Sequence, residues 1–124
     1  VDTRGGGGIL GSGEQRAFQV SGSGSGFAAQ GGKANGCGVP SAAVAVEASV
    51  SSVAPEGNGF FRAWPSGGAP ATATFLNFTK GEGVTNTGAI GLGSGTKDLT
   101  TKNFSARSHY VIDIQGYFIA PASS

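Results

Sequence analysis

Glycine occupies 24 of the 124 positions and interrupts the sequence at short intervals, which limits what the chain can fold into. Its clusters at residues 5–8 and 22–26 do not recur at every third position, so a collagen triple helix is excluded. No segment of eleven residues carries apolar side chains at the spacing of a helix face. Hydrophobic residues nevertheless make up 38% of the chain, including eight Phe, two Tyr and one Trp. That is enough apolar material for a core, so the sequence predicts a folded chain built from strands.

Alternating apolar and polar side chains predict a half-buried strand at residues 42–53. The residues expected on its buried face are Val44, Val46, Ala48 and Val50, and those expected on its solvent face are Glu47, Ser49 and Ser51. Six further strands are predicted, bounded by Gly, Pro, Asn and Ser, at residues 15–20, 59–64, 71–78, 87–92, 98–104 and 110–118. This rhythm predicts one all-β domain, residues 1–124, folded as an antiparallel β-sandwich of the jelly-roll or Ig-like type with long Gly/Ser-rich loops.

The connections between the predicted strands carry recognisable turn chemistry. Pro55 followed by Gly and Asn at residues 57–59 predicts a hairpin that joins strands 42–53 and 59–64. Similar turn residues follow Trp64 and Phe78, so a meander is expected through the middle of the chain. Residues 21–38 are too long for a turn, and we expect them to be a functional loop or an assembly contact.

The charge of the chain is unusually low. Charged residues make up 12% of the sequence and the formal net charge is +1, whereas an ordinary soluble domain has roughly a quarter charged residues. The basic residues are scattered singly, which argues against nucleic acid as a partner. No apolar run approaches the roughly 20 residues of a membrane-spanning helix. A surface of small uncharged side chains favours contact with other copies of the chain, although monomeric secreted β-domains can have a similar composition.

Cys37 is the only cysteine, so the chain cannot form an internal disulfide or a zinc site of several thiolates. A single cysteine is either a small buried hydrophobe, which we expect here, or half of a bridge to another chain or to a removed segment. Val1 in place of an initiator Met is typical of a processed or trimmed chain. Secretion or display on the cell surface is the expected location.

Charged and catalytic-type residues give little sign of chemistry. A structural ion pair between Arg4 and Asp113 is expected, with Asp2 beside Arg4, because a buried carboxylate needs a partner. The acidic residues do not have the spacing of a calcium loop. Ser108 and His109 are adjacent, so on a strand they would face opposite sides and could not act as nucleophile and base. We therefore expect no enzyme activity, no catalytic residue, no metal and no cofactor.

Phe60, Arg62 and Trp64 alternate along one predicted strand and would lie on the same face. Two aromatic rings with an Arg between them could form a platform for sugar stacking, although Phe and Trp in a small domain more often belong to the core. Asn77 and Asn103 each match the N-glycosylation pattern, which arises often by chance. These residues are the candidate binding and modification sites.

Several short motifs occur in a recognisable order. They are Asp2-Thr3-Arg4, Gly38-Val39-Pro40, Trp64-Pro65-Ser66-Gly67, Leu76-Asn77-Phe78 and Gly116-Tyr117-Phe118. In this order they resemble a β-rich module of secreted and cell-surface bacterial proteins, which occurs alone, in tandem or appended to other domains and has no catalytic role. Relatives often carry residues, sometimes a Cys, before Asp-Thr-Arg. Their absence here would shorten the first strand to residues 1–4 and leave Cys37 without a family-style partner.

Together these observations predict a non-enzymatic extracellular structural module. A short first strand would leave a sheet edge with unpaired N–H and C=O groups, which a neighbouring copy could complete. Contacts of this kind that do not close into a ring would produce a surface filament, sheath or matrix. The alternative is a carbohydrate-binding or adhesion module that uses Phe60, Arg62 and Trp64. The expected partners are other copies of the chain or, in the alternative, a polysaccharide.

Overall fold

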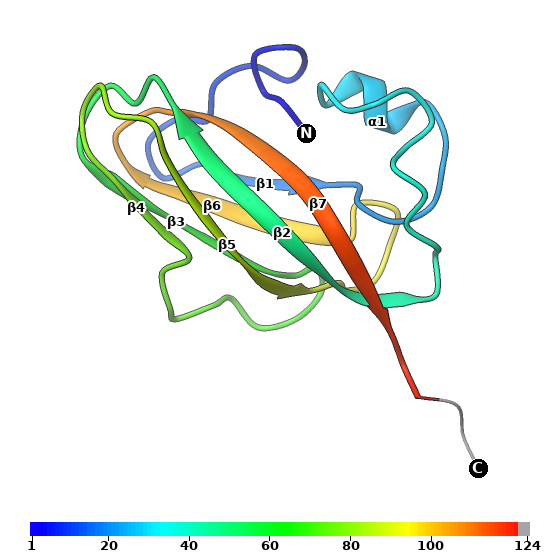
Figure 1. Cartoon of the computed structure of the whole chain (residues 1–124). Coiled ribbons are helices and arrows are strands. Elements are labelled where there is room, and N and C mark those ends of the chain that lie inside the picture. Colours follow the sequence, from blue (N-terminus) through cyan, green and yellow to red (C-terminus); the bar gives the residue numbers. More distant parts are fainter. Residues whose placement is uncertain (122–124) are drawn as a thin grey trace.

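The structure is a computed structural model that describes residues 1–121, which form seven strands and one short helix (Figure 1). In chain order the elements are β1 (Gln15–Phe18), α1 (Gly26–Ala29), β2 (Ala43–Val53), β3 (Gly59–Pro65), β4 (Leu76–Phe78), β5 (Val84–Gly91), β6 (Leu99–Ser105) and β7 (His109–Ile119). Every pair of neighbouring strands is antiparallel. The predicted all-β, antiparallel character is therefore confirmed.

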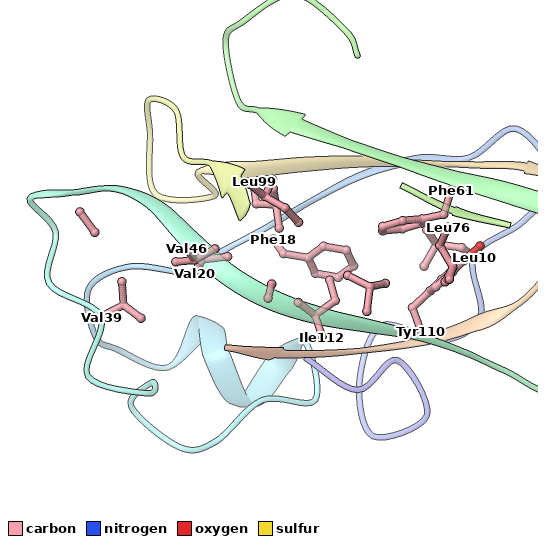
Figure 2. Close-up of a cluster of buried hydrophobic side chains, with 14 of the residues drawn as sticks. Leu10, Phe18, Val20, Val39, Val46, Phe61, Leu76, Leu99, Tyr110 and Ile112 are labelled. Carbon is pink, nitrogen blue, oxygen red and sulfur yellow. The ribbon is translucent and has the colours of Figure 1, made fainter. Parts of the chain in front are cut away.

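The strands form two sheets with a hydrophobic core between them. One sheet has four strands in the order β1-β6-β3-β4, and the other has three in the order β5-β2-β7. Figure 2 shows the core side chains pointing into the space between strands of the two sheets. Phe61 from β3 and Tyr110 from β7 meet there, with ring centroids 4.4 Å apart. Because successive side chains point to opposite sides of a strand, the side chains that are not in the core lie on the outward face of each sheet.

The predicted hairpin and meander are wrong. β2 pairs with β5 and β7, whereas β3 belongs to the other sheet, so residues 54–58 cross between the sheets. β3 and β4 are neighbours as a meander requires, but β5 belongs to the three-stranded sheet, beside β2. Turn residues reverse the chain direction, and they do not determine which strand lies alongside. On this side of the molecule β4 lies against β5.

Strand β2 matches its prediction closely, except at its start. Val46, Ala48 and Val50 are buried, but Val44 is exposed. The register between β2 and β7 shifts between Ala43 and Ala45, so Val44 does not continue the alternation. An irregularity of this kind turns a side chain away from the core and cannot be seen in the alternating pattern itself.

Residues 21–38 contain the short helix α1, which the sequence did not predict. Its Phe27 is buried and fixes the segment to the body of the protein. Gly31, with φ +76°, lies directly against the carbonyl of Asp2, where a Cβ atom would come within 1.8 Å of the oxygen. The loop therefore supports the N-terminal residues, and Figure 1 shows the N-terminus beside α1.

Candidate functional site

The N-terminal segment covers one part of the outer edge of β7. β7 is the last strand of its sheet, so only one of its edges pairs with β2. Along the other edge, the amide of Ile112 donates to the carbonyl of Val1 at 2.9 Å and the amide of Thr3 donates to the carbonyl of Tyr110 at 3.1 Å. The Tyr110 amide donates to the Thr3 hydroxyl at 3.0 Å. We call residues 109–112 the covered half of β7.

The remainder of β7, residues 113–119, has no such cover. Within the described residues 1–121, no backbone hydrogen bond reaches its outer edge. We call residues 113–119 the open half. Backbone N–H and C=O groups along a free edge can pair with any extended chain that approaches.

Large apolar side chains accompany the open half at its end. We call these four residues the apolar tip, and their exposed fractions are 46% for Val44, 51% for Tyr117, 49% for Phe118 and 61% for Ile119. Val44 belongs to the start of β2, where Ala43 pairs with Ile119 and Ala45 with Phe118. Figure 1 shows this end of β7 extending away from the rest of the molecule. An exposed cluster of large apolar residues is typical of an interaction surface.

The predicted ion pair between Arg4 and Asp113 is wrong. Arg4 instead donates from Nε and Nη2 to the two carboxylate oxygens of Asp2, at 3.0 and 2.8 Å. The Arg4 guanidinium therefore holds the pKa of the Asp2 carboxyl below its usual value. Asp113 is exposed, because it alternates with Ile112 and Ile114, which face the core. An exposed carboxylate is hydrated and needs no partner.

Cys37 is exposed rather than buried, so the expected buried thiol is wrong. Val39, two residues further on, is the buried member of this segment. The side chain of Cys37 borders a small hollow of about 20 Å³ that also has Val1 and Ile114 on its walls. Cys37 is thus accessible and lies near the start of the open half.

Of the predicted platform, Phe60 and Arg62 are half-buried, but Trp64 is only 6% exposed. All three alternate with buried Phe61 and lie on the outward face of the four-stranded sheet. Phe60 stacks on Phe104 of β6, with centroids 4.5 Å apart and planes 9° from parallel. Trp64 therefore cannot serve as an open platform, and Phe104 takes its place beside Phe60.

Two cations lie next to this aromatic pair. Arg62 lies over both rings, 5.4 Å from the centroid of Phe60 and 5.1 Å from that of Phe104. The Lys102 ammonium lies 5.0 Å from the centroid of Phe104. We call Phe60, Arg62, Lys102 and Phe104 the cation face. Sequence reasoning missed Lys102 and Phe104, because only the pairing of β3 with β6 brings them beside Phe60 and Arg62.

The two glycosylation candidates differ in access. Asn77 is exposed on β4. Asn103 is fully buried, and its amide nitrogen donates to the carbonyls of Leu10, Gly11 and Ala106. Its side-chain oxygen accepts from the Tyr110 hydroxyl. Asn103 is therefore a structural residue that cannot carry a glycan in the folded chain.

Other polar groups also have structural partners. His109 Nδ1 shares a hydrogen bond of 2.8 Å with the Thr3 hydroxyl, while the Ser108 hydroxyl donates to the backbone carbonyl of His109. The buried Asp98 carboxylate accepts from the amides of Val20 and Ser21, at 2.8 and 3.3 Å, and from the Ser21 hydroxyl. Asp98 thereby joins the end of β1 to the start of β6, a role that the sequence did not indicate.

Residues 1–121 contain no group of three or more His, Cys, Asp or Glu side chains placed to hold a metal ion. Within the same residues, no helix has the length and apolar character needed to cross a membrane. Comparisons of the chain with protein-family models, curated proteins and solved structures find no match. The resemblance to a bacterial surface module therefore stays a prediction.

Proposed function

We propose that the protein is a non-enzymatic structural module of the cell surface or extracellular space that assembles with other copies of itself. The observation that carries this proposal is the open half of β7, where an unpaired strand edge ends in the apolar tip. The module would be a β-sandwich of the jelly-roll or Ig-like type, and its assembly a filament, sheath or matrix. The location follows from the sequence prediction of secretion.

The way residues 1–3 pair with the covered half supports an extended strand as the partner of the open half. Residues 1–3 already lie along the covered half, where Val1 and Ile112 exchange both backbone hydrogen bonds at 3.1 and 2.9 Å. The open half continues the same edge, so an extended segment of a second copy can extend the same ladder. Its last residues offer Tyr117, Phe118 and Ile119 for burial in the contact.

The low charge of the chain supports a second copy of the same chain as the partner of the open half. A net charge of +1 produces little repulsion between identical molecules. The open half contains one ionisable acid, Asp113, and no Lys or Arg. Proteins that must stay apart usually protect a free edge with Lys, Pro or a bulge that twists it away. The register between β2 and β7 shifts between Glu47 and Ala48, opposite this half, but the apolar tip is still exposed.

Ile119→Lys is the variant that tests the proposal. A Lys at the tip adds a charge that must be desolvated on contact, so we expect assemblies of the wild type in electron microscopy and light scattering and smaller particles for the variant. Ala89→Lys, on the exposed face of β5, adds the same charge elsewhere and should assemble like the wild type. A wild type that stays monomeric at high concentration would contradict the proposal, as would equal loss of assembly in both variants.

A further inference from the structure

The outward face of the four-stranded sheet carries an ordered array of side chains. Register places Arg62 of β3 opposite Lys102 of β6, and Lys102 opposite Gln15 of β1. The adjacent row places Phe104 opposite Phe60, and Phe60 opposite Asn77 of β4. Neighbouring strands in a sheet lie about 4.8 Å apart. The two rows therefore form a compact surface of cations, amides and aromatic rings.

Arg62 and Lys102 are an unfavourable pair on their own. Like charges directly opposite each other on antiparallel strands destabilise a sheet. Within residues 1–121, neither Arg62 nor Lys102 forms a salt bridge with a carboxylate. Both cations are instead drawn over the Phe104 ring. Two adjacent cations without a counter-charge indicate that an anion from outside the chain fits between them.

The hydrogen-bonding capacity of Arg62 is largely unused. Its Nε is buried without a partner, and its Nη1 reaches the carbonyl of Ala71 only at 3.4 Å. A buried donor that lacks an acceptor costs stability, and because Nε is closed to solvent, a carboxylate from outside would meet the terminal nitrogens of the guanidinium. The planar guanidinium matches a carboxylate through two parallel hydrogen bonds.

Ring geometry favours an acidic ligand over a neutral one that stacks. Phe60 and Phe104 lie face to face, so each covers one face of the other. Ring edges carry the positive side of the aromatic quadrupole, and ring faces carry the negative side. Trp64 is too buried to offer a further stacking surface. This surface therefore offers little ring face on which a neutral sugar could stack, and it favours binding of a negatively charged group.

We propose that the cation face binds an acidic polysaccharide, a chain of sugars that carry carboxylates. Arg62 and Lys102 take the carboxylates, and the exposed amides of Gln15 and Asn77 on either side take hydroxyl groups of neighbouring sugars. This surface belongs to the four-stranded sheet, whereas the open half belongs to the other sheet. The proposal therefore does not depend on self-assembly.

Binding of polygalacturonate, with neutral dextran as the comparison, tests the proposal. The full chain is immobilised and each polymer is titrated at low and at high NaCl. We expect polygalacturonate to bind, dextran not to bind, and the affinity to fall at high salt. Lys102→Gln and Arg62→Gln should each weaken binding about tenfold, because each removes a charge-assisted contact. Thermal unfolding checks that both variants are folded, and the change at half-buried Lys102 preserves the test if Arg62→Gln is unstable.

Lys33→Gln is the matched control, since it removes the same charge from an exposed site in the loop after α1. Its affinity should equal that of the wild type. Failure of the wild type to bind polygalacturonate overturns the proposal, and so do equal binding of dextran and equal weakening by Lys33→Gln. Should Lys102→Gln reduce self-assembly while the wild type ignores the polymer, the face binds a second copy instead. Each assay is repeated on Ile119→Lys, so that failure of assembly and failure of ligand binding are seen separately.

Discussion

The covered and open halves of β7 share a partner strand and differ in what lies along their other edge. Both pair with β2 in antiparallel register. The covered half has residues 1–3 along its outer edge, and its Tyr110 and Ile112 are buried. The open half has no partner there among the described residues and ends in exposed Tyr117 and Phe118. Three residues of N-terminal chain are enough to change an edge from open to closed.

This difference shows that strand propensity and edge protection are separate properties. Both halves are rich in β-branched and aromatic residues, which favour strands. Among residues 1–121, only the covered half has partners for its outer edge, and the supporting groups come from residues far away in sequence, including Gly31. The open half is equally ready to pair, and none of the described residues 1–121 completes it.

The largest expected effect contrasts two tyrosines of the same strand. Tyr110 is fully buried against Phe61, and burial raises the pKa of its phenol. Tyr110→Ala should lower the free energy of unfolding by about 3 to 5 kcal/mol, because it leaves a cavity. Tyr117→Ala removes the same atoms from an exposed site and should change the free energy of unfolding by only about 0.5 kcal/mol or less. Urea unfolding of monomeric samples measures both, and similar losses would show that the two halves are not distinct.

A smaller effect is expected from uncovering the covered half. Gly31→Ala places a Cβ against the carbonyl of Asp2 at a residue with φ +76°, so residues 1–3 must move away from β7. We expect Gly31→Ala to lower the free energy of unfolding by about 1 to 3 kcal/mol and to speed hydrogen exchange at the amide of Ile112.

Gly95→Ala is the control for this change. Gly95 has φ +83° with nothing within 4 Å of the added carbon, so it imposes the same kind of backbone strain without the collision. Exchange at Ile112 should therefore stay slow in Gly95→Ala. Unchanged exchange in Gly31→Ala would show that the N-terminal segment does not depend on this close approach.

The positions of the strands could be predicted from the sequence because alternation is a local signal. Residues 42–53 and 110–118 fall within a residue or so of β2 and β7. Pairing is a long-range property, so the expected hairpin of β2 with β3 is wrong, and Phe104 could not be placed beside Phe60 in advance. Of the predicted strand at 71–78, only Leu76–Phe78 forms β4.

The candidate sites were predictable to a similar degree. Phe60 and Arg62 do share one face, as alternation requires, but Trp64 on the same face is buried, which alternation alone does not reveal. The sequence predicts a short first strand at residues 1–4, but the structure has only an isolated bridge there, between Asp2 and Val111, with residues 1–3 lying along β7. The exposure of Asp113 depends on which side of β7 faces the core. No local pattern near residue 4 reveals this, so the sequence did not show that Arg4 pairs with Asp2 instead.

The smallest expected effect concerns acid. Hydrogen bonding to Arg4 lowers the pKa of Asp2 in the folded chain below its usual value of 3.8. A lowered pKa adds stability above pH 3.8, and this stability is lost as the pH falls through the folded value, when the carboxyl becomes protonated. The pair is partly exposed, so wild type should lose only on the order of 1 to 3 °C in melting temperature from this source. Asp2→Asn should lack that part of the acid sensitivity.

The Glu56 carboxyl, whose pKa Arg107 lowers in the same way, remains in both proteins, so the difference between the two melting curves reports Asp2 alone. Because Asp2 lies opposite Val111, acid should reduce the hydrogen-exchange protection of amides in the covered half and leave that of amides in the open half unchanged. An equal response along the whole of β7 would show that Asp2 and Arg4 do not help to hold the N-terminal segment on its edge.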